Sequence, residues 1–191
     1  AAPDGYGLGT TAVTLTASDD LDNVSGSGWY YWGSSIPANA PSLLHFDSTP
    51  GYCSMFIISD VQIVFSYNDR NNIAIRSKNN SGFIPWEYVN PALKPGVEYR
   101  TTERYLGKPV YVKVVDCGNL PASGLKNIAH GIANCKPIHV YGEMSNGNTL
   151  PYAVGTNYYI SADGSYIQIY VTGDLSNQTV KATIKYTKTT D

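Results

Sequence analysis

The side chains that could do catalytic chemistry are few and lie far apart along the chain. The three histidines, His45, His130 and His139, occur singly, without the His-Glu-x-x-His spacing of a zinc-binding helix. His139 alternates with apolar neighbours, as a residue on one face of a strand would. We therefore expect structural histidines with satisfied hydrogen bonds rather than metal ligands or general bases.

The cysteines provide no metal or redox motif. Cys53, Cys117 and Cys135 are widely separated, and the sequence contains no Cys-x-x-Cys pair. Isolated cysteines are typical of small buried hydrophobes in a protein made in a reducing cytosol. We expect three such residues and no bound metal.

The acidic residues form no recognisable catalytic or calcium-binding pattern. Asp19, Asp20 and Asp22 resemble the start of a calcium loop, but the twelfth position counted from Asp20 is Tyr31 rather than Glu. We expect turn or capping roles for them. The other acids are scattered and do not indicate a glycosidase, whose carboxylate pair is defined by a distance in space. The sequence predicts that the protein is not an enzyme and needs no cofactor.

Aromatic and amide side chains in loops favour binding instead. Rings contact the C–H faces of sugars, while Asn, Asp and Gln hydrogen-bond to their hydroxyl groups. Loops at the end of a rigid sandwich are the usual place for recognition. Seven residues of the second half are therefore candidate glycan ligands: Tyr152, Asn157, Tyr158, Tyr159, Asp163, Asn146 and Asn148. Alternatively, the tyrosines pack on the sheet or at a subunit interface.

The elements that would position these residues are nearly all strands. In the first half, residues 53–59, 61–67, 73–78 and 83–89 predict a small antiparallel meander with Asn- and Gly-rich turns. Residues 124–134 have apolar side chains at helical spacing, interrupted by a glycine, and we expect a short helical turn or a loop there.

The second half predicts a more regular sheet structure. Residues 108–118, 136–144, 165–173 and 178–188 alternate between their two faces, and Asn-Gly and Asp-Gly pairs predict tight hairpins. One apolar face per strand is typical of an antiparallel sandwich with one solvated side. Residues 90–109 are rich in charged residues, proline and glycine, as linkers between domains often are. We therefore expect the domain boundary near residue 100.

Four adjacent aromatic residues, Trp29, Tyr30, Tyr31 and Trp32, raise a separate question. They could form a sugar-stacking surface, or a strand with rings on both faces. In an extended run, Trp29 and Tyr31 share one face, and Tyr30 and Trp32 share the other. The flanking Gly and Pro residues predict a short strand packed within the first module, with at most one pair exposed.

Composition excludes two classes of partner. The net charge of −2 provides no basic surface for nucleic acid. No run of about 18 apolar residues is present, so no membrane insertion is expected. Because the chain opens without Met, we expect a piece of a longer or processed polypeptide.

Three blocks in the second half resemble the terminal domain of bacteriophage tail fibres and related receptor-binding proteins. In order, they are YLGKPVYVKVVDCGNLP (residues 105–121), KNIAHGIAN (126–134) and VKATIKYTKTTD (180–191). The first half is similar to the pyocin-knob-like domains of phage and phage-tail bacteriocin fibres. The segments that show this similarity are YGLGT (6–10), DLDN (20–23), GWYYWGSSIPANAP (28–41), IAIRS (73–77) and PWEYV (85–89). Phe83 lies near the position where members of that family often have a second Trp.

The resemblance implies an all-β fold: a small antiparallel knob module in residues 1–100, then an antiparallel β-sandwich receptor-binding tip in residues 101–191. It further implies a homotrimer joined to an upstream fibre shaft or baseplate, made in the host bacterial cytoplasm and placed in the virion tail. The implied function is non-enzymatic adhesion to a bacterial cell-surface polysaccharide during host attachment. A polysaccharide depolymerase fragment and a purely structural fibre module remain alternatives.

Overall fold

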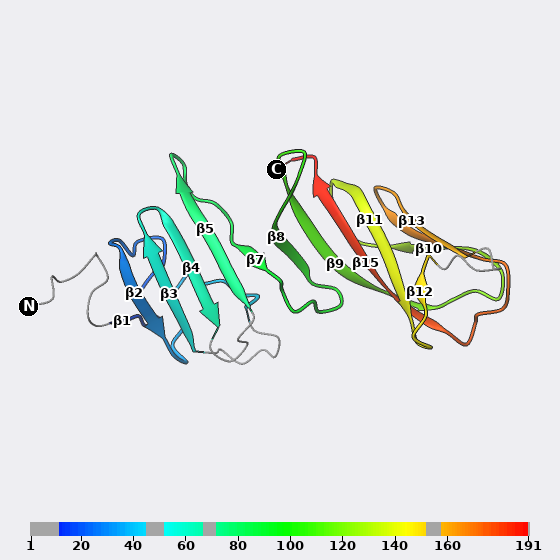
Figure 1. Ribbon diagram of the computed structural model, residues 1–191, viewed down its shortest axis with the longest axis horizontal. Helices are drawn as coiled ribbons and strands as arrows, with labels where there is room; N and C mark the ends of the chain where they lie inside the picture. Colours follow the sequence, from blue (N-terminus) through cyan, green and yellow to red (C-terminus); the bar gives the residue numbers. More distant parts are fainter. Residues whose placement is uncertain (1–11, 45–51, 67–71, 152–157, 191) are drawn as a thin grey trace, which may run out of the picture. The chain divides into compact units, whose positions relative to one another are not determined.

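The computed structural model describes residues 12–44, 52–66, 72–151 and 158–190. Every regular element in these ranges is a β-strand, and the strands pair mostly antiparallel, which confirms the predicted all-β class (Figure 1). No helix in the described ranges is long and apolar enough to cross a membrane. The chain divides into two compact units, Ala1–Ala92 and Leu93–Asp191, called the first and second unit below.

The first unit is built on one sheet. Its strands lie in the order β1-β2-β3-β4-β5-β7, and β6 pairs with the end of β5. β1 and β2 are parallel, and the other neighbours are antiparallel. The strands are β1 (Val13–Thr14), β2 (Gly28–Trp32), β3 (Cys53–Ile58), β4 (Val61–Ser66), β5 (Ile73–Asn79), β6 (Gly82–Phe83) and β7 (Glu87–Val89).

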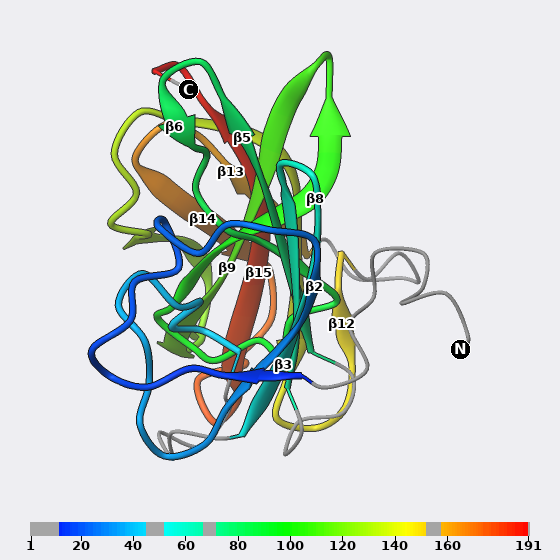
Figure 2. The same cartoon turned by 90° about the vertical axis from the view of Figure 1, so that its left-hand side faces the viewer.

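The four adjacent aromatics form β2 and alternate as predicted. Tyr30 and Trp32 are buried, with 8% and 2% of their surface exposed, whereas Trp29 and Tyr31 are 40% and 42% exposed. The buried pair belongs to a core closed by Leu21 and other side chains of the irregular segments. Figure 2 shows the coil that precedes β3, in blue and cyan, on one side of the strands.

The opposite face of this sheet carries no charged side chain on β2 to β5. We call it the apolar face, and Trp29 contacts Phe56 across two of its strands, with ring centroids 4.7 Å apart. Its members alternate along the strands and pair across them: Trp29, Tyr31, Ser54, Phe56, Ile58, Val61, Ile63, Phe65, Ile73, Ile75 and Ser77.

The second unit is a sandwich of two sheets. The larger sheet has the order β8-β9-β15-β11-β12, and the smaller has the order β10-β14-β13. The strands are β8 (Glu98–Tyr105), β9 (Lys108–Asn119), β10 (Gly124–Ala129), β11 (Cys135–Met144), β12 (Thr149–Leu150), β13 (Tyr159–Ala162), β14 (Tyr166–Val171) and β15 (Thr179–Lys188). The sequence placed the domain boundary near residue 100, which lies inside β8, and β8 pairs with β9 of the second unit.

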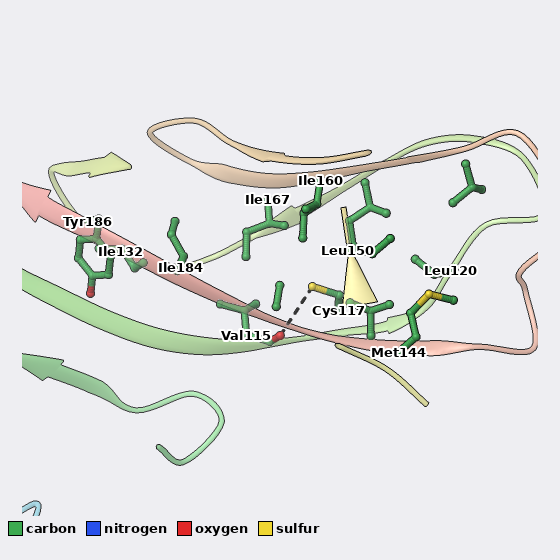
Figure 3. Packing of buried hydrophobic residues seen from close by; sticks show 14 of the residues in the cluster. Val115, Cys117, Leu120, Ile132, Met144, Leu150, Ile160, Ile167, Ile184 and Tyr186 are labelled. Atoms are coloured by element: carbon green, nitrogen blue, oxygen red, sulfur yellow. Dashed lines mark hydrogen bonds between the residues drawn. The ribbon is translucent and has the colours of Figure 1, made fainter. Parts of the chain in front are cut away.

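The core of the second unit lies between its sheets. Ile167, Ile169 and Val171 of β14 face Ile184 and Tyr186 of β15, and all five are fully buried. Figure 3 shows Ile160 and Ile167 directed from the smaller sheet toward Ile184, Val115 and Leu150. This matches the apolar sides predicted for residues 165–173 and 178–188.

Three local expectations were wrong. Residues 124–129 form strand β10 rather than a helical turn, because each residue pairs with β14 and alternate side chains face the core. Residues 83–89 form two short strands instead of one, since Pro85 cannot donate to a ladder. Strand β9 has no solvated side, because Val110, Val112 and Val114 are buried as well as Tyr111 and Val115.

Candidate functional site

The predicted ligands Asn146 and Asn148 lie in the tight turn between β11 and β12. The side-chain oxygen of Asn146 accepts a hydrogen bond from the backbone N–H of Asn148 (3.1 Å), and Gly147 takes a positive φ of 84°. Beside the turn is a hollow of about 350 Å³, lined by Glu143, Met144, Ser145, Gly147, Thr179 and Lys181. The lining is polar but contains no aromatic ring on which a sugar could stack.

Asp163 lies in a different turn, and its carboxylate is hydrogen-bonded to the backbone of that turn. Its Oδ1 accepts the N–H groups of Ser165 and Tyr166, both at 2.7 Å. These bonds hold the pKa of the Asp163 carboxyl below its usual value, because they stabilise the charged form. Gly164 in this turn lies near the start of β11 at Cys135, whereas Asn146 follows the end of β11. Asp163 and the two asparagines therefore do not share a site.

His130 is a structural residue, as predicted. It is 2% exposed, its Nδ1 accepts the N–H of Ile132 at 3.1 Å, and its Nε2 lies 3.2 Å from the carbonyl oxygen of Asp163. Since Nδ1 accepts, the proton of the neutral ring belongs on Nε2. His130 thus joins the loop after β10 to the β13–β14 turn. His139 is exposed, and His45 lies outside the described residues.

Tyr158 and Tyr159 lie at the beginning of β13, and their side chains are on opposite sides of the sheet. Tyr158 packs against the sandwich core. Tyr159 is 48% exposed on the other side, where its ring stacks on Tyr170 with centroids 5.3 Å apart and planes 14° apart. The remaining two predicted ligands, Tyr152 and Asn157, lie outside the described residues.

Tyr159 and Tyr170 belong to a surface that was not predicted from the sequence. It is the side of the β10-β14-β13 sheet that faces away from the core, and we call it the outer face. Strand register sets Leu125 beside Tyr170 and Tyr159, and Asn127 beside Gln168 and Ser161, with Tyr166 opposite Ala129. No charged residue occupies these strand positions. The outer face therefore combines rings with amide and hydroxyl groups on a rigid sheet, and it is the better candidate for sugar contact.

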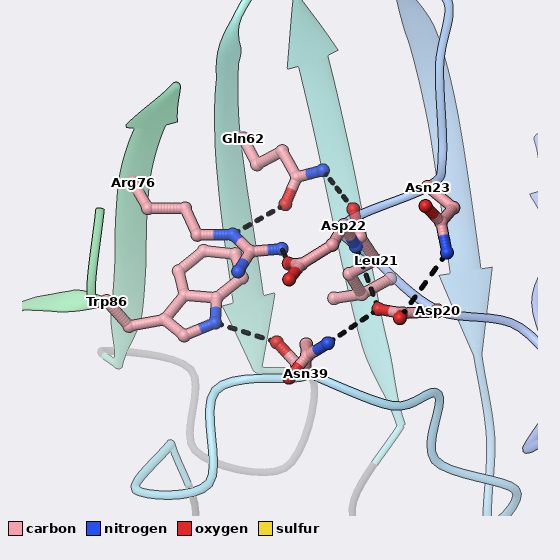
Figure 4. Close-up of polar contacts among 8 residues, drawn as sticks. All are labelled: Asp20, Leu21, Asp22, Asn23, Asn39, Gln62, Arg76 and Trp86. Atoms are coloured by element: carbon pink, nitrogen blue, oxygen red, sulfur yellow. Dashed lines mark hydrogen bonds and ion pairs between the residues drawn. The ribbon is translucent and has the colours of Figure 1, made fainter. Parts of the chain in front are cut away.

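A second cluster gathers the blocks of the knob resemblance around Arg76. The Arg76 side chain is 6% exposed; its Nη2 lies 2.7 Å from Oδ1 of Asp22, and its Nε donates to Oε1 of Gln62 at 2.9 Å. Gln62 in turn donates to the carbonyl oxygen of Leu21 at 2.7 Å. Figure 4 shows these groups converging from β4, β5 and the loop before β2.

Aromatic rings complete the surroundings of Arg76. Its guanidinium carbon lies 4.2 Å from the Phe83 ring centroid and 4.3 Å from that of Trp86. Trp86 also donates from Nε1 to the carbonyl oxygen of Asn39 at 2.9 Å. Phe83 contributes a π face to the cation, which a second Trp could equally do. The DLDN, IAIRS and PWEYV segments are thus tied together by one buried charge.

Electrostatics in this cluster favours a structural role. Burial lowers the pKa of Arg76, while the Asp22 carboxylate opposes that change by stabilising the cation. Asp20 accepts the backbone N–H of Asp22 at 2.9 Å and the amide of Asn39 at 2.8 Å, which lowers its pKa. The expected turn role of Asp20 is confirmed. Among the described residues, no group of three His, Cys, Asp or Glu side chains could hold a metal ion.

Comparisons with known proteins give remote neighbours. No protein-family model matches the chain, and no curated protein matches it. One similar solved structure is the N-truncated R2-type pyocin tail fibre, with 14% identity, a TM-score of 0.34, and coverage of 95% of this chain and 99% of that chain. Another is an R2 pyocin fibre of P. aeruginosa, comprising C-terminal residues 323–691, with 14% identity, a TM-score of 0.35, and coverage of 97% and 69%. Both are tail fibres, the kind of protein named by the resemblance.

Proposed function

We propose that this chain is the receptor-binding end of a phage or phage-like tail fibre, acting as a non-enzymatic adhesin for a bacterial surface glycan. The observation that carries glycan binding is the outer face of the second unit. Its stacked Tyr159 and Tyr170 rings lie beside Gln168 and Asn127 on an uncharged sheet surface. Rings cover the apolar side of a sugar, and amides bond its hydroxyls.

The fibre role is supported by the way in which the resembling blocks fold together. The first and third blocks supply β9 and β15, which pair over most of their length. The second block supplies β10 and the buried His130, whose backbone oxygen accepts a hydrogen bond from Lys113 of β9 at 3.0 Å. Three segments separated in sequence thus form one structural unit, as residues that specify a shared domain would.

A homotrimer is part of the same proposal, and the apolar face of the first unit supports it. Trp29, Tyr31, Ile58 and Phe65 are 40%, 42%, 55% and 36% exposed on one uncharged surface. Contiguous exposed apolar patches are limited in size on monomers, and large ones mark interaction sites. We propose that this face lies at the threefold axis, where the same uncharged, apolar residues of three chains meet without charge repulsion.

The function is tested by attachment to cells. The fluorescently labelled 191-residue chain is incubated with a panel of bacterial strains, and the bound label is measured by flow cytometry. We expect attachment to some strains only, and a loss of about five- to thirteenfold for Tyr170→Ala, since one sugar–aromatic contact is worth about 1–1.5 kcal/mol. Tyr105→Ala removes an exposed tyrosine (46%) from β8, which belongs to the other sheet of the second unit, and serves as the control.

Three results would contradict the proposal. Equal attachment of Tyr170→Ala and the unchanged protein would remove the outer face as the binding surface. Attachment to no strain would favour the purely structural fibre module. Release of reducing sugar from cell-surface polysaccharide by the same protein would instead establish a depolymerase.

A further inference from the structure

A second hollow lies in the first unit, on the side of the sheet that carries the Arg76 cluster. Its volume is about 450 Å³, within the range of small-ligand sites, which is about 300–1,000 Å³. One wall is the loop of residues 22–27; the others are the β3–β4 turn around Asp60 and the β5–β6 hairpin with Lys78 and Phe83. All of these residues belong to the described part of the first unit.

The walls of this hollow are held in place by buried or backbone groups. The buried Tyr30 donates from its hydroxyl to the carbonyl oxygens of Ser25 (3.1 Å) and Gly26 (2.9 Å), which fixes the loop. Ser27 Oγ accepts the backbone N–H of Ser59 at 3.2 Å and joins the loop to the β3–β4 turn. The backbone N–H of Lys78 donates to the carbonyl oxygen of Asp60 at 2.8 Å, joining that turn to β5. The Arg76–Asp22 pair anchors the entry of the loop.

The side chains around the hollow present unused polar groups. Within the described residues, the Asp60 carboxylate and the Lys78 ammonium make no hydrogen bond or ion pair, although the ammonium lies 5.7 Å from the Phe83 ring centroid. The loop adds hydroxyl groups and the side-chain oxygen of Asn23, whose amide nitrogen donates to Asp20 Oδ2 at 3.4 Å, and Phe83 supplies a ring. Acceptors, donors and one ring around a small volume suit a polyhydroxylated ligand.

We propose that this hollow is a binding site for a neutral sugar residue, separate from the outer face of the second unit. A neutral ligand is favoured because the charges around the hollow balance: Arg76 is paired with Asp22, and the Lys78 ammonium offsets the Asp60 carboxylate. The hollow therefore has no net positive charge to attract phosphate, sulfate or sugar acids. The site extends the proposed function, since an adhesin with a sugar site in each unit could contact a polysaccharide at two places. It can nevertheless be tested without any cell.

The test is a titration of the ¹⁵N-labelled full chain, followed by amide chemical shifts. The probes are D-glucose, D-galactose, D-mannose and N-acetyl-D-glucosamine, each added to about 50 mM, because single sugars bind such sites on the order of millimolar. We expect at least one sugar to shift the amides of residues 22–27 and of Asp60 and Lys78. Asp60→Asn and Lys78→Ala should each weaken that binding about five- to tenfold, as the loss of one hydrogen bond does.

A filling variant and a matched control complete the experiment. Ser25→Tyr places a ring into the hollow while its backbone contact with Tyr30 is kept, and we expect it to abolish the shifts. Ser81→Tyr adds the same ring at the neighbouring β5–β6 turn outside the lining and should bind as the unchanged chain does. The inference is overturned if no sugar shifts these amides, or if Ser25→Tyr binds the responding sugar as well as Ser81→Tyr.

Failure of this inference can be told apart from failure of the proposed function. If cells are bound strain-specifically but the first-unit amides do not respond, the hollow is no sugar site and the adhesin stands. If the hollow binds sugar but the chain attaches to no strain, the attachment function is wrong and the site stands.

Discussion

Replacing Arg76 by Met tests whether one buried charge holds the first unit together. Arg76→Met keeps an unbranched side chain as far as the position of Nε and removes the cation between Asp22, Gln62, Phe83 and Trp86. Buried ion pairs are often replaceable by apolar residues at no cost, because the desolvation of the charges is also removed. The contacts of Gln62 decide the outcome in this case.

Gln62 is fully buried, and its Oε1 accepts a hydrogen bond from Arg76. Without Arg76, that acceptor loses its donor inside the core, which costs about 1–3 kcal/mol. The lost contact of the cation with two rings adds about 1 kcal/mol, and the pair with the half-exposed Asp22 adds less. Part of this cost is offset, because the buried charge no longer has to be desolvated. We expect the free energy of unfolding to fall by about 2 kcal/mol, which lowers the Tm of a unit of this size by roughly 8–16 °C.

Tryptophan fluorescence during thermal unfolding is the suitable assay, since Trp29, Trp32 and Trp86 all lie in the first unit and the second unit has none. Lys78→Met is the control: it removes an exposed cation from the same strand and should change the Tm by no more than a few degrees. An Arg76→Met variant within 0.5 kcal/mol (approximately) of the unchanged protein would refute the reasoning, because the desolvation relief would then outweigh the orphaned Gln62.

Three further predictions concern both units. Trp32→Ala should destabilise the first unit by about 3–5 kcal/mol, measured by chemical unfolding, because the ring is 2% exposed; loss of cell binding with an intact fold would contradict this. The folded protein should react with a thiol reagent at pH 8 at least 100-fold more slowly than the unfolded protein. The reason is that burial raises the pKa of Cys53 to about 12 and the pKa values of Cys117 and Cys135 to about 11. Labelling of the folded chain at the rate of the unfolded chain would contradict this prediction. Asp163→Asn should lower the Tm at pH 7, and the difference should shrink as the pH falls below about 4. The folded-state pKa of Asp163 is depressed, so its stabilisation is present above the unfolded value near 4 and is lost as the pH falls through the folded value; a Tm difference that does not shrink in acid would argue against the turn contacts.

Much of the strand structure could be predicted because it depends on local alternation. The apolar sides of β14 and β15 and the exposure pattern of β2 follow directly from a period of two. Strand β10 was missed because Leu125 and Ile128 also fit helical spacing, and its pairing with distant β14 decides the matter. The split of residues 83–89 could have been predicted from Pro85 alone.

The candidate site was harder to predict from the sequence than the strands were. Asn146 and Asp163 attracted interest as polar loop residues, yet each bonds the backbone two residues further on, which is what such residues do in turns. Tyr159 was selected as a candidate ligand from the sequence, whereas its stacking partner Tyr170 was not. Their stacking depends on the register of β13 against β14, which no local pattern specifies.

The molar mass of the full chain in solution tests the fibre proposal most directly. Multi-angle light scattering after size exclusion, at about 10 µM, should give a single species of three 20.7 kDa chains, about 62 kDa. Tyr31→Ser, on the apolar face, should shift this species toward smaller mass, while the exposed Tyr105→Ser on β8 should leave it unchanged. A single species of 20.7 kDa at that concentration would contradict a trimeric fibre tip.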